Sequence, residues 1–248
     1  MLIYVFLSEV MMNKLAIVTG ASRGIGKEAG CYFASQGYDL ALIARDEKQL
    51  DALSKDLMQK HGVKASAYPL DVSDGQRVNE AVKNIAQHYS NIDVLFNSAG
   101  MLLHGTSTIE TEDFNRMLDV NLRGVYHFIH AVVPYMKKQR SGYIFNLASY
   151  AGKRPLARSG AYCMTKYGVL GYSQSLSLEL LEFNIKVTAL CPSVVNTDMT
   201  RHIPDFPDKE KILCEDIIHS IDYLLHLNAN AYVDEITIKS TYLLKNSV

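Results

Sequence analysis

The sequence has no tryptophan, few prolines and few cysteines. Only four cysteines occur among its 248 residues, and none of them belongs to a CxxC pair. No histidine stands at metal-ligand spacing from any of them, which argues against a zinc site, so no metal is expected. We interpret Cys31, Cys163, Cys191 and Cys214 as free, buried thiols of a reducing compartment, and we therefore predict a cytoplasmic protein.

Long apolar runs and an excess of either charge are also missing. The apolar run 2–7 falls far short of the roughly 20 residues that span a bilayer. It carries neither a basic region nor a small-residue cleavage site, so it does not resemble a signal peptide. We treat residues 1–12 as an N-terminal extension and 13–248 as a single domain. The formal net charge of −1 argues against nucleic acid and membranes as partners.

The sequence does contain a regular alternation of short apolar runs and longer amphipathic stretches. Strands are predicted over 14–19, 38–44, 64–70, 92–97, 142–148, 185–190 and 232–239, and helices over 25–36, 47–61, 74–89, 111–139, 159–182 and 209–227. Pro134 is expected to interrupt the fourth helical region with a kink. Near-continuous apolar strands separated by helices predict an α/β fold, a Rossmann-like doubly wound parallel sheet with helices on both faces.

A glycine-rich turn follows the first predicted strand. Glycines stand at Gly20, Gly24 and Gly26, with Ser22, Arg23 and Ile25 between them, and a predicted helix begins there. Glycine lets a backbone turn sharply or approach a ligand closely, and a helix N-terminus offers free N–H groups to a pyrophosphate. The spacing is GxxxGxG rather than the commoner GxGxxG, and a tight strand–helix connection is the alternative.

The end of the second predicted strand bears on the choice between NAD and NADP. Ala44 stands where an acid would bind the ribose hydroxyls of NAD, and Arg45 follows it. Arg45 and Arg23 can instead bind a 2′-phosphate, so we favour NADP(H). A shift of one residue in the register would bring Asp46 into the acidic position, and Arg45 would then be a solvated loop charge.

Residues after the third and fourth strands are further candidates for cofactor contacts. Asp71 and Val72 are placed to touch the adenine, whereas Asn97, Ala99 and Gly100 can lie against the ribose and nicotinamide half. Each set follows a predicted strand at its carboxyl end, where ligands bind in open parallel sheets. Taken singly, each of these signals is weak.

Four polar residues in the second half of the chain are candidates for catalysis. Tyr162 and Lys166 share one helix face, and a nearby ammonium lowers the pKa of a tyrosine, which favours acid–base chemistry. A Tyr-x-x-x-Lys pair on its own is usually a surface feature. Ser149 follows a strand and can bond a substrate oxygen, and the amide of Asn121 can hold a helix irregularity and a water.

Together these motifs resemble the short-chain dehydrogenase/reductase family over about residues 13–239. The features that carry the resemblance are the turn 19–26, the stretch Asn97-Ser98-Ala99-Gly100, Asn121, Ser149 and the segment from Tyr162 to Lys166. The resemblance implies that Tyr162 is the acid–base, Ser149 polarises the substrate oxygen and Asn121 holds a relay water. It further implies that Lys166 binds the nicotinamide ribose and lowers the tyrosine pKa, that Pro192 and Thr197 contact the cofactor, and that copies form a homotetramer or homodimer.

The sequence also departs from the family pattern at three places. Ser98 stands where a second Asn is usual, Ser193 stands where a Gly is usual, and the C-terminus lacks the Gly-rich ending of many bacterial 3-oxoacyl-carrier-protein reductases. We expect the changes at Ser98 and Ser193 to alter loop geometry without abolishing activity, whereas the different C-terminus weakens, without excluding, the specific assignment as a 3-oxoacyl-carrier-protein reductase. The substrate wall is expected in 101–104, 151–156 and 193–206.

The function predicted from the sequence is hydride transfer between NADP(H) and a carbonyl or alcohol. An NADPH-dependent carbonyl or 3-oxoacyl-thioester reductase fits best, with a small molecule as substrate. The alternative is a catalytically idle nucleotide-sensing or scaffold protein on the same fold. A sugar-nucleotide epimerase or dehydratase would need a larger C-terminal part.

Overall fold

The computed structural model describes residues 13–201, 203 and 206–246. The predicted N-terminal extension, 1–12, therefore lies outside the described residues. Among the described helices, none combines the length and the apolar character that a bilayer crossing requires.

A seven-stranded parallel sheet forms the centre of the molecule, with the strand order β3-β2-β1-β4-β5-β6-β7. The strands are β1 (Leu15–Thr19), β2 (Asp39–Ala44), β3 (Ala65–Pro69), β4 (Val94–Asn97), β5 (Gly142–Leu147), β6 (Ile185–Pro192) and β7 (Glu235–Ile238). Because the order reverses direction between β1 and β4, the loops after these two strands diverge and leave a crevice at their carboxyl ends. The predicted Rossmann-like doubly wound sheet is confirmed.

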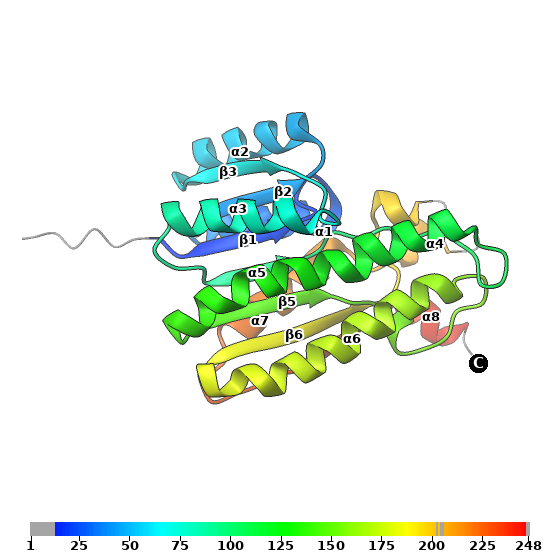
Figure 1. Cartoon of the computed structure of the whole chain (residues 1–248). Helices are drawn as coiled ribbons and strands as arrows, with labels where there is room; N and C mark the ends of the chain where they lie inside the picture. Colours follow the sequence, from blue (N-terminus) through cyan, green and yellow to red (C-terminus); the bar gives the residue numbers. More distant parts are fainter. Residues whose placement is uncertain (1–12, 202, 204–205, 247–248) are drawn as a thin grey trace, which may run out of the picture.

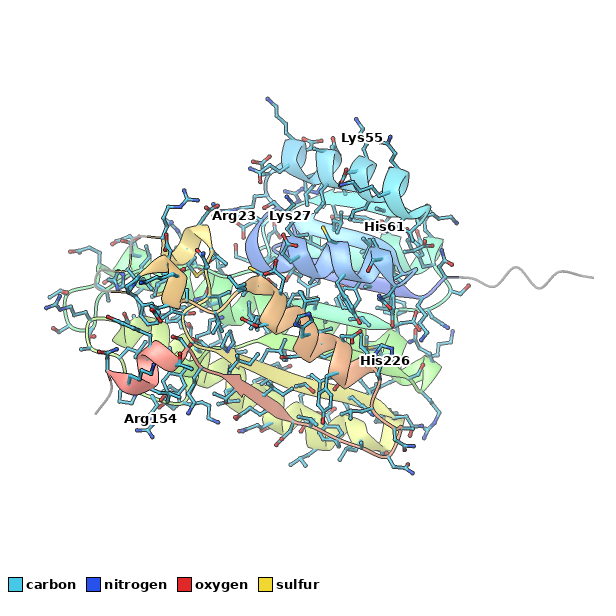
Figure 2. All side chains as sticks on the ribbon, turned by 180° about the vertical axis from the view of Figure 1, so that it is seen from behind. Arg23, Lys27, Lys55, His61, Arg154 and His226 are labelled. Carbon is cyan, nitrogen blue, oxygen red and sulfur yellow. The ribbon has the colours of Figure 1, made fainter. Side chains whose placement is uncertain are left out.

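Helices cover both faces of this sheet, as Figure 1 shows. They are α1 (Gly24–Ser35), α2 (Glu47–His61), α3 (Gly75–His88), α4 (Thr111–Leu118), α5 (Gly124–Gln139), α6 (Gly160–Leu180), α7 (Cys214–Leu225) and the short α8 (Thr241–Lys245). Buried residues of α3, α5 and α6 form one hydrophobic core with the sheet. Buried residues of α1, α2 and α7 form the other on the opposite face, which Figure 2 presents to the viewer. Successive residues of a strand point alternately into the two cores. Both faces of each strand are therefore buried, which explains the continuous apolar runs in the sequence.

The fourth predicted helical region is broken, but not at the expected place. Asp119–Arg123 forms a π-helical segment between α4 and α5, whereas α5 continues through Pro134. The predicted interruption at Pro134 is therefore wrong, and the irregularity surrounds Asn121 instead. The Asn121 side chain bonds the loop after β4 rather than pointing to solvent. Such π-helical segments often occur at functional sites.

The last predicted helix starts later than its sequence pattern indicates. A short 3₁₀ turn at Asp208–Glu210 precedes it, and α7 begins only at Cys214. Ile212 is drawn into a bridge with Val195, and its N–H donates to the Val194 carbonyl at 3.0 Å. This pairing takes the backbone groups that a longer helix would need, so the prediction of a helix from 209 is corrected.

Candidate active site

One cleft, with a volume of about 610 Å³, lies at the carboxyl ends of the central strands. It gathers most of the predicted site residues from β/α loops that are far apart in the chain. The predicted site residues that line it are Gly20, Ser22, Arg23, Gly24, Ile25, Arg45, Asp71, Val72, Ala99, Gly100, Ser149, Tyr162, Lys166, Pro192 and Thr197. Three predicted site residues, Gly26, Asn97 and Asn121, lie behind this lining.

The glycine turn after β1 is packed so closely that side chains do not fit there. A Cβ at Gly20 would lie 2.9 Å from the Ala99 Cα, and Gly20 has a φ of +66°. A Cβ at Gly26 would lie only 2.3 Å from the Gly20 carbonyl oxygen. Gly26 therefore acts from behind the cleft, by letting α1 begin directly against the turn.

The N-terminus of α1 opens into the cleft with its N–H groups uncapped by a side chain. Arg23 occupies the N-cap position in an extended conformation and makes no side-chain capping bond. By contrast, Asp46 caps α2 and Asp74 caps α3. The first turn of α1 is thus left with free donors and the positive end of the helix dipole, which suits a phosphate group.

Thr19 joins this turn to the loop after β4. Its hydroxyl oxygen accepts bonds from the Ser98 N–H at 3.0 Å and the Ala99 N–H at 3.1 Å. The two loops that border the crevice are therefore held at a fixed separation. Ser98, which stands where the family pattern usually has Asn, takes part in this arrangement through its backbone N–H.

The end of β2 presents a cation and no free acid. Ala44 is the last residue of the strand and lines the cleft. Arg45 is exposed and lies 3.8 Å from the Asp71 carboxylate. Both carboxylate oxygens of Asp46 bond Gln49, one to its backbone and one to its side chain, at 3.0 and 2.8 Å. Asp46 is thus occupied as the cap of α2, so a ribose-binding acid in this position is not supported.

Asn97 is buried under the cleft rather than facing it. Its amide donates to the Asn146 oxygen at 2.9 Å, and Asn146 in turn donates to the Ser173 hydroxyl at 2.9 Å. Asn97 is only 2% exposed, so its side chain lies within the sheet, beneath the residues that line the cleft, and its contact with a cofactor stays a prediction.

Asn121 fastens the loop after β4 to the π-helical segment. Its side chain accepts from the Met101 N–H and donates to the Met101 carbonyl, both at 2.8 Å. It also donates to the Thr165 hydroxyl at 3.2 Å. The predicted helix irregularity is present, and both N–H groups of the Asn121 amide are used, one on the Met101 carbonyl and one on the Thr165 hydroxyl.

Tyr162, Ser149 and Lys166 meet at the inner wall of the cleft. A side-chain hydrogen bond joins Ser149 to Tyr162, and the Ser149 hydroxyl also accepts from the Ala151 N–H at 3.1 Å. The Lys166 ammonium donates to the Leu147 carbonyl at 2.8 Å and lies 5.7 Å from the centre of the Tyr162 ring. The Tyr-x-x-x-Lys pair and Ser149, which lie apart in the sequence, are therefore brought together.

The protonation of this group differs from the prediction. Burial raises the pKa of the Tyr162 hydroxyl to about 12, although the Ser149 bond works in the opposite direction. Burial also lowers the pKa of Lys166 to about 8. The expected lowering of the tyrosine pKa by Lys166 is not seen, because burial penalises both charged forms.

Sequence reasoning missed Arg116 and Val120, which also line the cleft. They precede Asn121 along the same helical stretch and are four residues apart, so their common helix face was the available signal. Of the predicted substrate wall, Met101, Leu102, Ser193 and part of 194–200 line the cleft, whereas 151–156 does not. The 3₁₀ turn Tyr150–Gly152 directs the chain away after Ser149. Residues 202, 204 and 205 of that wall lie outside the described residues.

The loop after β6 is tied to the C-terminal helix. The Ser193 hydroxyl accepts from the Ser240 N–H at 2.9 Å, and the Ser240 hydroxyl donates to the Glu210 carbonyl at 2.6 Å. The Phe206 and Tyr242 rings pack edge to face with centroids 5.1 Å apart. Two departures from the family pattern, Ser193 and the C-terminal sequence, thus contact each other.

Comparison with known proteins agrees with this geometry. A family model described as short chain dehydrogenase matches residues 14–208. The chain belongs to the short chain dehydrogenase family. It is similar to an uncharacterized oxidoreductase of Staphylococcus epidermidis, with 34% identity over 92% of this chain and 97% of the relative.

Solved short chain dehydrogenase structures align closely with this one. An alcohol dehydrogenase of the archaeon Thermococcus sibiricus, complexed with 5-hydroxy-NADP, aligns with a TM-score of 0.85 and 28% identity over 92% of this chain and 97% of that one. A beta-ketoacyl-[ACP] reductase of Bacteroides thetaiotaomicron aligns with a TM-score of 0.84 and 34% identity over 95% and 100%. Both alignments thus cover more than nine-tenths of this chain.

Proposed function

We propose that this protein transfers a hydride between NADP(H) and a carbonyl or alcohol substrate, as an NADPH-dependent carbonyl or 3-oxoacyl-thioester reductase. The observation that carries this proposal is the meeting of Tyr162, Ser149 and Lys166 in one cleft with the glycine turn. The NADP derivative in the archaeal relative and the ketoacyl reductase among the similar structures support it. The alternative, an idle nucleotide sensor, is disfavoured because a sensor has no need of the complete polar set.

The residues of the cleft fit a pyridine dinucleotide phosphate. The uncapped start of α1 would bind the pyrophosphate, and Arg45 with Arg23 would bind the 2′-phosphate next to Ala44. Asp71 and Val72 would border the adenine, whereas Gly100, Lys166, Pro192 and Thr197 would border the ribose and nicotinamide end. The bound cofactor supplies the hydride.

The chain's own residues would manage the proton and the substrate oxygen. With a pKa of about 12, the Tyr162 hydroxyl stays protonated at neutral pH and can donate its proton to a carbonyl oxygen. The Ser149 hydroxyl would hold that oxygen by a hydrogen bond and stabilise its developing charge. The protonated form is the one that reduction of a carbonyl requires. The homotetramer or homodimer and the cytoplasmic location stay predictions from the sequence.

A panel of ketones and 3-oxoacyl thioesters, followed by the loss of NADPH absorbance, tests this function directly. We expect turnover of at least one carbonyl class with NADPH and slower turnover with NADH. Tight NADPH binding without turnover of any member would favour the sensor instead.

The Arg45→Ala variant is expected to bind NADPH about ten- to a hundredfold more weakly, because a charge-assisted bond to phosphate is lost. NADH binding should change by less than about threefold, since NADH has no 2′-phosphate. Fluorescence titration of both cofactors measures the ratio. Lys55→Ala is the control, because this exposed cation lies on α2, away from the cleft residues, and is labelled in Figure 2. Equal losses for the two cofactors would contradict the role of Arg45.

Cofactor affinity should also depend on pH through Lys166. Burial lowers the pKa of this lysine to about 8, so the ammonium is present below that pH and is lost as the pH rises through it. We expect the NADPH dissociation constant to rise about three- to tenfold between about pH 7 and about pH 9.5. In Lys166→Met the affinity should be weaker and flat over that range. A wild-type affinity that does not change with pH would refute the involvement of the charge.

A further inference from the structure

A second pocket, of about 380 Å³, lies outside the cleft and shares none of its lining residues. It is lined by Tyr150, Lys153, Arg154, Thr237 and Lys239. Tyr150 directly follows Ser149, and Thr237 pairs with Cys191 across β7 and β6. The pocket therefore sits at the carboxyl end of the last strand, the sheet edge at which doubly wound folds bind ligands.

Cations outnumber carboxylates around this pocket. Lys153 forms a salt bridge with Glu235, which is largely buried, and Asp234 contributes a more distant negative charge. Within the part of the chain that the structure describes, Arg154 and Lys239 have no carboxylate at salt-bridge distance. Arg154 lies at the same end of the molecule as α8 in Figure 2. The pocket thus retains a positive charge that none of the described carboxylates neutralises by a salt bridge.

The lining supplies donors in an arrangement that suits an oxyanion. The Lys239 ammonium lies 5.8 Å from the centre of the Tyr150 ring, so a cation–π contact holds it over the pocket wall. The Lys153 ammonium, which is paired with Glu235, also donates to the Thr237 hydroxyl at 3.3 Å and so fixes this hydroxyl in the pocket lining. Arg154 adds a planar guanidinium that can bind a carboxylate or phosphate by two bonds. Concavity and hydroxyl groups distinguish this cluster from scattered surface lysines.

The pocket is also close to the catalytic group without being part of it. Cys191 is fully buried and pairs across β6 and β7 with Thr237 of the pocket lining. Tyr150 of the same lining directly follows Ser149 of the cleft, so the two sites are neighbours. A ligand in the pocket would be adjacent to the active site while leaving the cleft free.

We propose that this pocket binds the carboxylate or phosphate group of a small anionic molecule, with Arg154 and Lys239 as the main recognition residues. The anion is either the acidic end of a substrate that reaches past Tyr150 or a separate small molecule. The anion-binding claim stands without the proposed function, because binding can be measured in the absence of turnover.

Calorimetric titration of the full chain with inorganic phosphate and with succinate, after saturation with NADPH, tests the site. We expect saturable binding that is weakened at least about tenfold in the double variant Arg154→Gln/Lys239→Gln. The matched control, Lys55→Gln/Lys60→Gln on α2, should bind as the wild type does. Circular dichroism melting confirms that both variants are folded. Absence of saturable binding, or equal binding by all three proteins, overturns the proposal.

Kinetics with matched ketones then distinguishes the two sources of the anion. If the anion belongs to the substrate, the double variant should raise KM about tenfold for a ketone bearing a carboxylate and leave its neutral analogue unchanged. If the anion is a separate molecule, both KM values stay unchanged while phosphate or succinate binding is lost. Either result supports the pocket, whereas loss of turnover for the neutral ketone with anion binding intact overturns it.

Discussion

Tyr162→Phe is expected to lower turnover by about a thousandfold or more and to leave the NADPH dissociation constant within about threefold of wild type. The variant keeps the ring that lines the cleft but removes the hydroxyl that bonds Ser149. General acid–base catalysis raises reaction rates by about a hundred- to ten-thousandfold. Removal of this one hydroxyl should therefore slow the chemical step by a factor of that size. NADPH absorbance loss measures turnover, and fluorescence titration measures binding.

Tyr167→Phe is the matched control for this variant. Tyr167 lies on the same helix but is 45% exposed, and it does not line the cleft. Its loss should change neither turnover nor binding by more than about twofold. Undiminished turnover by Tyr162→Phe would remove the acid–base assignment, whereas equal losses in both variants would point to a disturbed helix.

Gly26→Ala should have the largest effect on the fold and on cofactor binding together. The new Cβ would lie 2.3 Å from the Gly20 carbonyl oxygen and 2.7 Å from its carbon. Both are backbone atoms that no rotamer change can move, so α1 must shift away from the turn. We expect a loss of about 2–3 kcal/mol in the free energy of unfolding, measured by urea denaturation. NADPH affinity should fall at least about a hundredfold, because the phosphate-binding N–H groups move with the helix.

Gly30→Ala provides the control within the same helix. A Cβ there would meet only the end of the Leu42 side chain, at 3.4 Å. The free energy of unfolding should change by less than about 1 kcal/mol, because alanine favours the helix and Leu42 can adjust. If Gly26→Ala were as stable as Gly30→Ala and bound NADPH normally, the close approach of α1 to the turn would not matter for the site.

The sequence was most informative where local and tertiary preferences agree. The helix Glu47–His61 was predicted with its observed bounds, since Asp46 caps its start and Gly62 ends it in a left-handed conformation. The strands are recognisable because both faces of the sheet are covered and their apolar runs are continuous. Helices whose ends depend on distant partners were predicted less well.

Long-range contacts account for the features that the sequence did not reveal. The delayed start of α7 depends on the bridge between Val195 and Ile212, which no local pattern encodes. The helix α8 was not predicted, and its start depends on Ser240 bonding both its own first turn and the distant Ser193. The pKa of Tyr162 is raised mainly by burial in the folded protein. The prediction from the sequence considered only Lys166, one helical turn away, and therefore expected a lowered pKa.

The strand order has a consequence for how the protein can be assembled during synthesis. As the chain leaves the ribosome, β2 can join β1, and β3 can join β2. Then β4 can take the other side of β1, and β5, β6 and β7 can follow it outwards in turn. After β1, each of the six later strands can be added to an edge that already exists, so none has to be inserted between two finished neighbours. The strand order thus allows the nascent sheet to grow in the order of translation.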